Sequence, residues 1–281
     1  MPAASGLNGH PAASRSPGWA MDIHRYIGLA QVIFAIALVV VFPLIDQPAM
    51  RRLKQFSSGA ARLALYRRSV AATWIFALVA LTLAPLNTLL RVMPQHGELA
   101  WLVDHVVIRA MATALVTLLF AWVLWPGAQC AWNKRIRQKY FPAYRASFIC
   151  FLLPVAREER MWWIWLSITA GIGEELLYRG FMLHFLRGDL AGGPAWGLTL
   201  AWLLSSCAFG AAHVYQGVRG VTETTIAGLT FGLLALLTGN LVLPIVLHSL
   251  IDLRILLTYH PMQDAPDEAV TLISGFSSQN H

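Results

Sequence analysis

Runs of mainly apolar residues dominate this sequence and limit the fold that it can adopt. They lie near 27–45, 70–90, 103–125, 162–186, 195–213, 224–238 and 240–258, and the run at 224–238 is short. Roughly 18 apolar residues in a helix are enough to cross about 30 Å of hydrocarbon. Hydrophobic residues make up 57% of the chain and charged residues 12%, which excludes an ordinary soluble domain. We therefore predict an all-α, polytopic membrane helix bundle of about seven transmembrane helices.

A further apolar segment, residues 147–156, is too short to cross a bilayer as a helix. It contains Pro154, so we expect an interfacial or re-entrant piece. An eighth crossing at this segment stays open, and the predicted number of transmembrane helices is therefore seven to eight.

The same pattern divides the chain into four parts. Residues 1–26 are rich in Pro, Gly, Ala and Ser and lack the features of a secretory signal, so we expect a disordered tail. Residues 27–160 are expected to hold the N-terminal transmembrane helices with basic loops. Residues 161–258 hold the remaining helices and the polar residues discussed below, and residues 259–281 form a polar C-terminal tail.

The basic residues are placed as in a membrane protein. A formal net charge of +7 is compatible with a nucleic-acid partner, but Lys and Arg concentrate in two segments between apolar runs, 46–69 and 126–160. This pattern sets membrane orientation. We therefore expect a multi-pass protein of the inner (plasma) membrane, in contact with lipid, with both basic segments cytoplasmic and no nucleic-acid partner. Trp162, Trp163 and Trp165 fit an aromatic belt at the interface.

Three charged residues, Glu174, Glu175 and Arg179, lie inside the fourth apolar run. A charged side chain near the middle of a bilayer costs on the order of 3 kcal/mol, so these groups are tolerated only if they pair or line a polar cavity. Glu175 and Arg179 are spaced i, i+4 and face each other on a helix, whereas Glu174 is rotated by about 100°. We expect an ion pair between Glu175 and Arg179, with Glu174 left as a general base. Three glycines would let neighbouring backbones approach this motif: Gly171, Gly173 and Gly180.

Two later apolar runs also carry polar residues. His213 ends the fifth run, and His248 and Asp252 share one face of the seventh. With Glu174 they provide a carboxylate base and imidazoles, the groups needed to activate water and stabilise an oxyanion. The same residues could bind zinc with an open position for water. Each of these four residues could instead be structural and only form hydrogen bonds between helices. Their occurrence together is what favours a catalytic role.

Three motifs in succession resemble those of a known family. They are EExxxR from Glu174 to Arg179, FxxxH from Phe209 to His213 and HxxxD/N from His248 to Asp252. Together they are similar to the CPBP family of intramembrane proteases, also called the CAAX-protease and bacteriocin-processing or Abi family, in its bacterial branch. The resemblance covers about residues 160–258. It implies an intramembrane endopeptidase that acts on a peptide or a membrane-anchored protein.

The resemblance also implies a role for each motif residue. Glu174 is similar to the glutamate that activates water together with a histidine, here His213. Glu175 and Arg179 resemble the pair that shapes the site.

His248 and Asp252 resemble the pair that lines the site and stabilises the oxyanion, but the best-known prenyl-protein members have asparagine where this chain has Asp252. A carboxylate donates a hydrogen bond only when protonated, so orientation of His248 or a metal-like arrangement is the alternative role. The resemblance favours a glutamate mechanism with no cofactor over a zinc-dependent one. Outside catalysis, the alternatives are a membrane scaffold or bacteriocin-immunity protein that retains the motif. A transporter is a weaker alternative, since no inverted repeat is visible.

Overall fold

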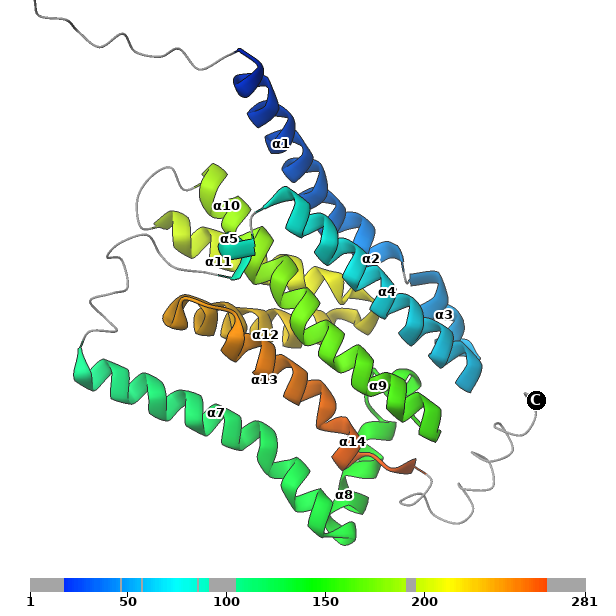
Figure 1. The fold of residues 1–281 in the computed structure, drawn as a ribbon. Helices are drawn as coiled ribbons and strands as arrows, with labels where there is room; N and C mark the ends of the chain where they lie inside the picture. The colour runs from blue at the N-terminus through cyan, green and yellow to red at the C-terminus, as the bar shows by residue number, and fades with distance from the viewer. Residues whose placement is uncertain are drawn as a thin grey trace, which may run out of the picture.

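The protein is almost entirely helical in the part of the chain that its computed structural model describes (Figure 1). The described residues are 18–45, 47–56, 58–84, 86–90, 105–190 and 196–261. Their elements are α1 (Gly18–Ile36), η1 (Ala37–Val41), α2 (Phe42–Ile45), α3 (Gln47–Gln55), α4 (Gly59–Leu83), α5 (Leu86–Leu90), α7 (Val106–Trp132), α8 (Lys134–Arg145), η2 (Cys150–Leu152), α9 (Arg157–Thr169), η3 (Ala170–Glu174), η4 (Leu176–Met182), α10 (Leu183–Leu190), α11 (Trp196–Ala212), η5 (Val214–Gln216), α12 (Gly217–Thr238), α13 (Val242–Leu253) and α14 (Ile255–Thr258). The predicted all-α class is confirmed for these residues.

Four helical stretches within the described residues are long and apolar enough to cross a membrane. They are Arg25–Gln55, Gly59–Leu83, Val106–Trp132 and Val214–Thr238. Two other apolar helices are shorter, since α11 has 17 residues and α13 has 12. Helix length and composition therefore support a membrane protein, and the count of seven to eight crossings stays a prediction.

The sixth predicted helix is not short, and this corrects the expectation for 224–238. In the structure α12 has 22 residues and begins at Gly217, whose φ of 79° favours glycine. Its first turns are polar and carry an exposed ion pair in which Arg219 Nε lies 2.8 Å from Glu223 Oε1. These charges interrupt the hydropathy of the segment, but at i, i+4 they stabilise the helix.

Both predicted tails need correction where they adjoin the bundle. The first helix begins at Gly18, so the disorder expected for residues 18–26 is wrong; this stretch has no proline, and the helix of the first span extends back through it. Residues 1–17 lie outside the described part of the chain. At the other end Tyr259 is buried in an aromatic cluster, and residues 262–281 are again outside the described ranges.

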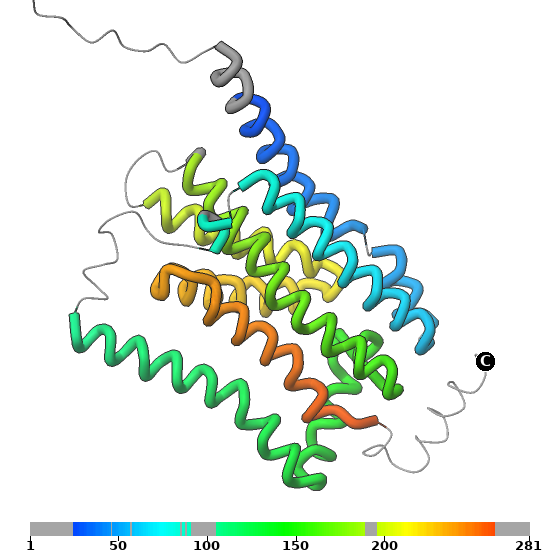
Figure 2. Tube along the Cα trace, in the orientation of Figure 1, coloured from blue at the N-terminus to red at the C-terminus, as the bar shows by residue number. Residues whose placement is uncertain are grey.

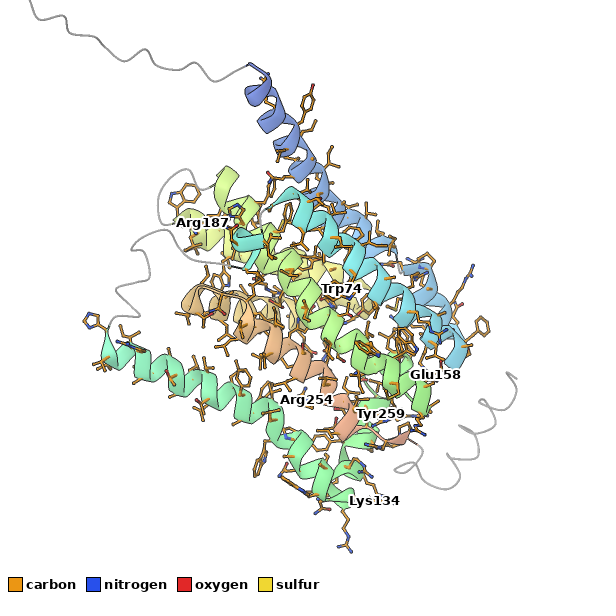
Figure 3. All side chains as sticks on the ribbon, viewed as in Figure 1. Trp74, Lys134, Glu158, Arg187, Arg254 and Tyr259 are labelled. Atoms are coloured by element: carbon orange, nitrogen blue, oxygen red, sulfur yellow. The ribbon has the colours of Figure 1, made fainter. Side chains whose placement is uncertain are left out.

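The two basic segments meet at one end of the bundle. This end holds α3, α8 and the N-terminal ends of α4 and α9 (Figure 1). In Figure 3, Lys134 and Glu158 lie toward it and Arg187 lies toward the opposite end. Residues 147–156 form turns and η2 here and no spanning helix. One apolar cluster ties these parts together: Met50, Leu53, Leu65, Phe151 and Leu152.

A continuous helical path from α9 through η3 and η4 to α10 crosses the middle of the bundle (Figures 1 and 2). Glu174 and Arg179 lie on its two wide π-helical turns, and Glu175 lies between these turns. Such turns are frequent at functional sites. The flanking glycines allow neighbouring helices to approach closely, as predicted. A Cβ on Gly171 would lie 2.0 Å from Ser249 Oγ of α13, and one on Gly180 would lie 2.8 Å from the Leu89 carbonyl of α5. Gly173 packs in the same way against Thr73 of α4.

Candidate active site

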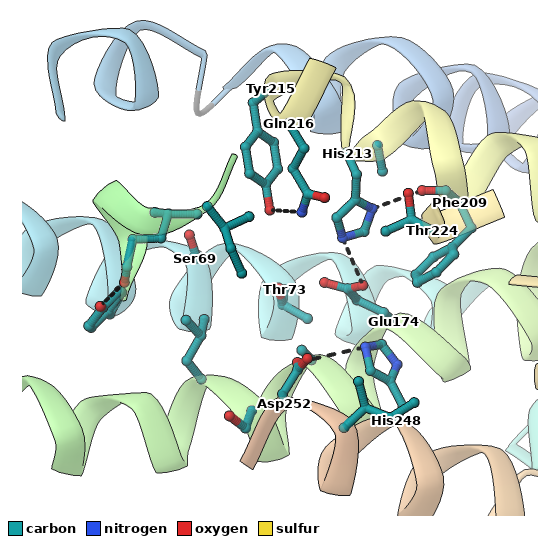
Figure 4. Close-up of a pocket in the computed structure, with 18 of the residues that line it drawn as sticks. Ser69, Thr73, Glu174, Phe209, His213, Tyr215, Gln216, Thr224, His248 and Asp252 are labelled. Atoms are coloured by element: carbon teal, nitrogen blue, oxygen red, sulfur yellow. Dashed lines mark hydrogen bonds and ion pairs between the residues drawn. The ribbon is translucent and has the colours of Figure 1, made fainter. Parts of the chain in front are cut away.

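A cavity of about 250 Å³ lies at the centre of the bundle, next to the π-helical turns. Four of the six predicted site residues line it: Glu174, His213, His248 and Asp252 (Figure 4). They come from η3, the end of α11 and α13, so helices far apart in the sequence bring them together. The remaining two predicted residues, Glu175 and Arg179, are buried in the protein and are not among the lining residues.

Glu174 and His213 face each other across the cavity (Figure 4). His213 Nε2 lies 3.9 Å from Glu174 Oε2, and their side chains are 15% and 14% exposed. His213 Nδ1 lies 2.9 Å from the Phe209 carbonyl oxygen, which can only accept, so Nδ1 carries the proton. In the neutral ring Nε2 is then an acceptor pointed at a carboxylate. Glu174 Oε2 has no hydrogen-bond partner among the described residues. Two hydrogen-bond acceptors, Glu174 Oε2 and His213 Nε2, therefore face the cavity.

The local fold explains this position of His213. The α11 helix ends at Ala212, and His213 leaves helical geometry with φ −100° and ψ 20°. Its ring also packs edge-on against Phe209, with ring centroids 5.0 Å apart. The FxxxH spacing therefore places the aromatic ring and the carbonyl of one residue against one imidazole.

Glu175 connects Arg179 to His248, which goes beyond the predicted ion pair. Its Oε1 lies 2.8 Å from Arg179 Nη1 and 2.9 Å from His248 Nδ1. Arg179 Nη2 also donates to the Gly228 carbonyl at 3.1 Å. The Glu175 and Arg179 side chains are 0% and 1% exposed. Such buried charges persist only with partners of this quality, so the network fixes η4, α12 and α13 relative to one another.

Two aromatic rings separate the guanidinium of Arg179 from the cavity. It lies 4.3 Å from the ring centroid of Phe209 and 5.3 Å from that of Phe231, and both rings line the cavity. Cation–π contacts of this kind favour a desolvated arginine. Phe231 also stacks on His248, with centroids 5.0 Å apart and planes 19° apart.

Asp252 is the most accessible of the cavity carboxylates. Its Oδ2 lies 3.8 Å from His248 Nε2, and its side chain is 33% exposed. The predicted i, i+4 proximity of His248 and Asp252 is therefore present, although at a distance beyond a hydrogen bond. The backbone carbonyl of Asp252 accepts a hydrogen bond of 3.0 Å from Trp163 Nε1.

Several residues near the site were missed by reasoning from the sequence. Trp163 is 7% exposed and lines the cavity, so its assignment to an interfacial belt is wrong, whereas Trp165 is 59% exposed. Glu159 is buried and forms two bonds to Arg62, at 2.9 and 3.0 Å. No spacing rule links the members of these pairs, because they lie on different helices. Polar side chains that also line the cavity are Tyr66, Ser69, Thr73, Ser167, Tyr215, Gln216 and Thr224.

The described residues contain no group of three or more His, Cys, Asp and Glu side chains placed to hold a metal ion. The carboxylates and imidazoles of the cavity approach each other in two pairs, His213 with Glu174 and His248 with Asp252. These side chains can transfer protons and form hydrogen bonds at a polar site inside an apolar bundle.

These observations define a helical membrane protein that encloses a polar site of carboxylates and imidazoles. Residues 156–254 match the model of the family described as type II CAAX prenyl endopeptidase Rce1-like. The match agrees with the resemblance of residues 160–258 to the CAAX-protease family. An uncharacterized 24.3 kDa protein of Escherichia coli is 35% identical over 82 residues, which are 29% of this chain. The matched region spans 36% of that relative's length, and no solved structure gave a significant match.

Proposed function

We propose that the chain is an intramembrane endopeptidase in which Glu174 and His213 activate a water molecule for hydrolysis of a peptide bond. The observation that carries the proposal is the pair of facing acceptors, Glu174 Oε2 and His213 Nε2, at 3.9 Å. That separation is too long for a direct hydrogen bond. A water molecule bound to both would donate one proton to each, which orients its lone pair toward a substrate carbonyl.

In this mechanism Glu174 is the general base and then the general acid. It takes a proton as the water oxygen forms a bond to the carbonyl carbon, and it returns a proton to the nitrogen as the C–N bond breaks. His248 donates its Nδ1 proton to Glu175, and in its protonated form its Nε2 carries a second proton that can be donated to the oxyanion. Arg179 acts on the reaction only by holding Glu175.

A non-catalytic scaffold explains less of this arrangement. The bonded network of Glu175, Arg179 and His248 would suit a purely structural role. A packing role gives no reason for two carboxylates, Glu174 and Asp252, on the wall of a cavity, where each carries a desolvation cost. The cavity carboxylates therefore favour catalysis.

The proposal extends to the setting of the enzyme. We expect the inner (plasma) membrane, with the basic segments 46–69 and 126–160 on the cytoplasmic side. The expected partners are membrane lipid and a peptide or membrane-anchored protein substrate, with no nucleic acid.

The mechanism can be tested with the purified chain in liposomes. Incubation with host membrane proteins is expected to produce new N- and C-termini, detected by mass spectrometry, that persist in 1,10-phenanthroline. Loss of the new termini with the chelator, and their return with added zinc, would replace the proposed mechanism with the zinc-dependent one. No new termini under any condition would contradict the endopeptidase.

The role of Asp252 can be tested by substituting asparagine, the residue that the best-known prenyl-protein members have at this position. Asp252→Asn is expected to keep kcat within about tenfold of wild type, because an amide of the same size still donates or accepts beside His248. Asp252→Leu removes both abilities and is expected to lower kcat about 100-fold. The measurement is the rate of peptide cleavage in liposomes. Equal losses in the two variants would show that the negative charge is required, and would contradict a hydrogen-bonding role.

A further inference from the structure

A second pocket, of about 470 Å³, lies at the end of the bundle where the basic segments meet. It is formed by the first turns of α9, the residue Val155 before them, and the chain in and after α14. Its polar lining residues are all basic: Arg157, Arg160 and His260. The others are apolar: Val155, Met161, Ile164, Leu256 and Pro261. None of these residues is among those that line the central cavity.

The acidic residues beside Arg157 and Arg160 do not neutralise them. Glu158 is exposed and pairs with Arg67 at 2.8 Å, and Glu159 is buried and bonded on the other side of α9. Neither arginine of the pocket forms an ion pair with a carboxylate in the described part of the chain. The pocket therefore carries positive charge for which these residues supply no counter-ion.

Arg160 joins α9 to the end of α14 and keeps further donors. Its Nη1 donates to the Tyr259 carbonyl at 2.9 Å, and its Nη2 donates to the Leu256 carbonyl and lies 3.2 Å from His260 Nε2. A guanidinium can only donate, so His260 accepts through Nε2 and its ring adds no positive charge. These three bonds leave Nε–H and one Nη1–H of Arg160 without a partner among the described residues.

A further positive charge lies close to this pocket. Partial burial, and then the charge of Arg137 on α8, lower the pKa of Arg160 from its usual value. A lowered pKa means that the surroundings disfavour the guanidinium cation, and an anion bound beside it would offset that cost. The pocket is thus suited to a ligand that carries negative charge.

The apolar part of the pocket follows the charged part along α9. Residues 157, 160, 161 and 164 share one helix face at spacings of i, i+3, i+4 and i+7, so the arginines stand at the helix end and Met161 and Ile164 come after them. Met161 is 53% exposed, and Trp165 is 59% exposed beside Ile164, as expected at a membrane interface. A phospholipid has the same order of groups, a charged phosphate followed by an acyl chain.

We propose that this pocket binds an anionic phospholipid, with the phosphate at Arg157 and Arg160 and an acyl chain along Met161 and Ile164. The site is separate from the central cavity and does not depend on the proposed function. Basic pockets between membrane helices are suited to acidic headgroups. A lipid bound here also contacts both α9 and the chain after α14, so it stabilises the folded protein.

The test uses the purified full-length chain in a non-ionic detergent, with phosphatidylglycerol and phosphatidylcholine of the same acyl chains. Native mass spectrometry is expected to show at least about fivefold tighter binding of phosphatidylglycerol, whose phosphate has no cation attached to it. Phosphatidylglycerol is also expected to raise the Tm more than phosphatidylcholine does. Equal binding of the two lipids would overturn the anionic headgroup.

Inorganic phosphate separates a lipid site from a site for a free anion. At the same concentration as the lipid it is expected to leave the Tm unchanged, because it gains no burial of an acyl chain. A rise in Tm equal to that with phosphatidylglycerol would show that the chain contributes nothing, and would overturn the lipid as the ligand.

A pair of arginine variants tests the position of the site. Arg157→Gln is expected to weaken phosphatidylglycerol binding about fivefold. Its Tm without lipid is expected to stay that of wild type, because Arg157 is exposed and has no protein partner to lose among the described residues. Arg51→Gln is the matched control, since Arg51 is an exposed arginine on α3, at the same end of the bundle and outside the pocket. Its binding is expected to change by less than about twofold. Equal losses in the two variants would show a diffuse effect of surface charge and contradict a defined pocket.

Discussion

Replacement of Glu174 by glutamine is expected to lower the rate of proteolysis by at least about 100-fold, the usual contribution of a general base, while folded protein persists in the membrane. Glutamine has the size of glutamate but cannot take a proton from water. Its amide can donate to His213 Nε2, which is an acceptor when Nδ1 is bonded to the Phe209 carbonyl. The substitution therefore removes the base without leaving a new unpaired acceptor.

The measurement compares protein N- and C-termini by mass spectrometry in host cells that carry wild type or Glu174→Gln at matched membrane levels. Termini confined to wild type would support the protease and identify its substrates. Glu158→Gln is the matched control, because Glu158 lies on α9, is 61% exposed and pairs with Arg67 at the surface. We expect its termini to match those of wild type. Identical termini in wild type and Glu174→Gln would instead favour the scaffold or immunity protein.

The polar residues of the site were predictable because their spacing obeys helix geometry. The i, i+4 rule placed Arg179 beside Glu175 and Asp252 near His248, and both are observed. A rotation of about 100° between adjacent residues gave Glu174 and Glu175 different partners, as the structure has them. The family match spans residues 156–254, a range that contains all three motifs.

Contacts between helices could not be read from spacing. The bond from His248 to Glu175 joins residues 73 positions apart, and that from Trp163 to the Asp252 carbonyl joins residues 89 apart. Hydropathy also misjudged Trp163, because a tryptophan that faces a cavity has the same composition signal as one that faces the interface. These contacts and the burial of Trp163 depend on how the helices pack, which local spacing in a single sequence does not indicate.

Replacement of Arg179 by alanine is expected to destabilise the protein by about 3 kcal/mol or more, because it leaves a buried carboxylate without its cation. Glu175 would keep one partner, His248 Nδ1, and its Oε2 already has no hydrogen-bond partner among the described residues. The contacts of the guanidinium with Phe209 and Phe231 would be lost as well. The measurement is unfolding of the purified protein in detergent by heat or denaturant.

The chain supplies a matched control in Arg219, which forms the same i, i+4 type of pair with Glu223 at the same 2.8 Å distance. These side chains are 81% and 52% exposed, so Arg219→Ala is expected to cost about 0.5 kcal/mol or less. Similar losses from the two alanine variants would show that burial of the Glu175–Arg179 pair has no energetic consequence.

A double variant separates loss of charge balance from loss of packing. Arg179→Ala with Glu175→Gln leaves no buried carboxylate without its arginine, so it is expected to be more stable than Arg179→Ala alone. If the double variant is instead the less stable of the two, the contacts of Arg179 with the aromatic rings, and not its charge, hold η4 in place. In that case the second glutamate of the motif would serve His248 alone. Replacement of Glu175 would then affect the rate of cleavage more than it affects the free energy of unfolding.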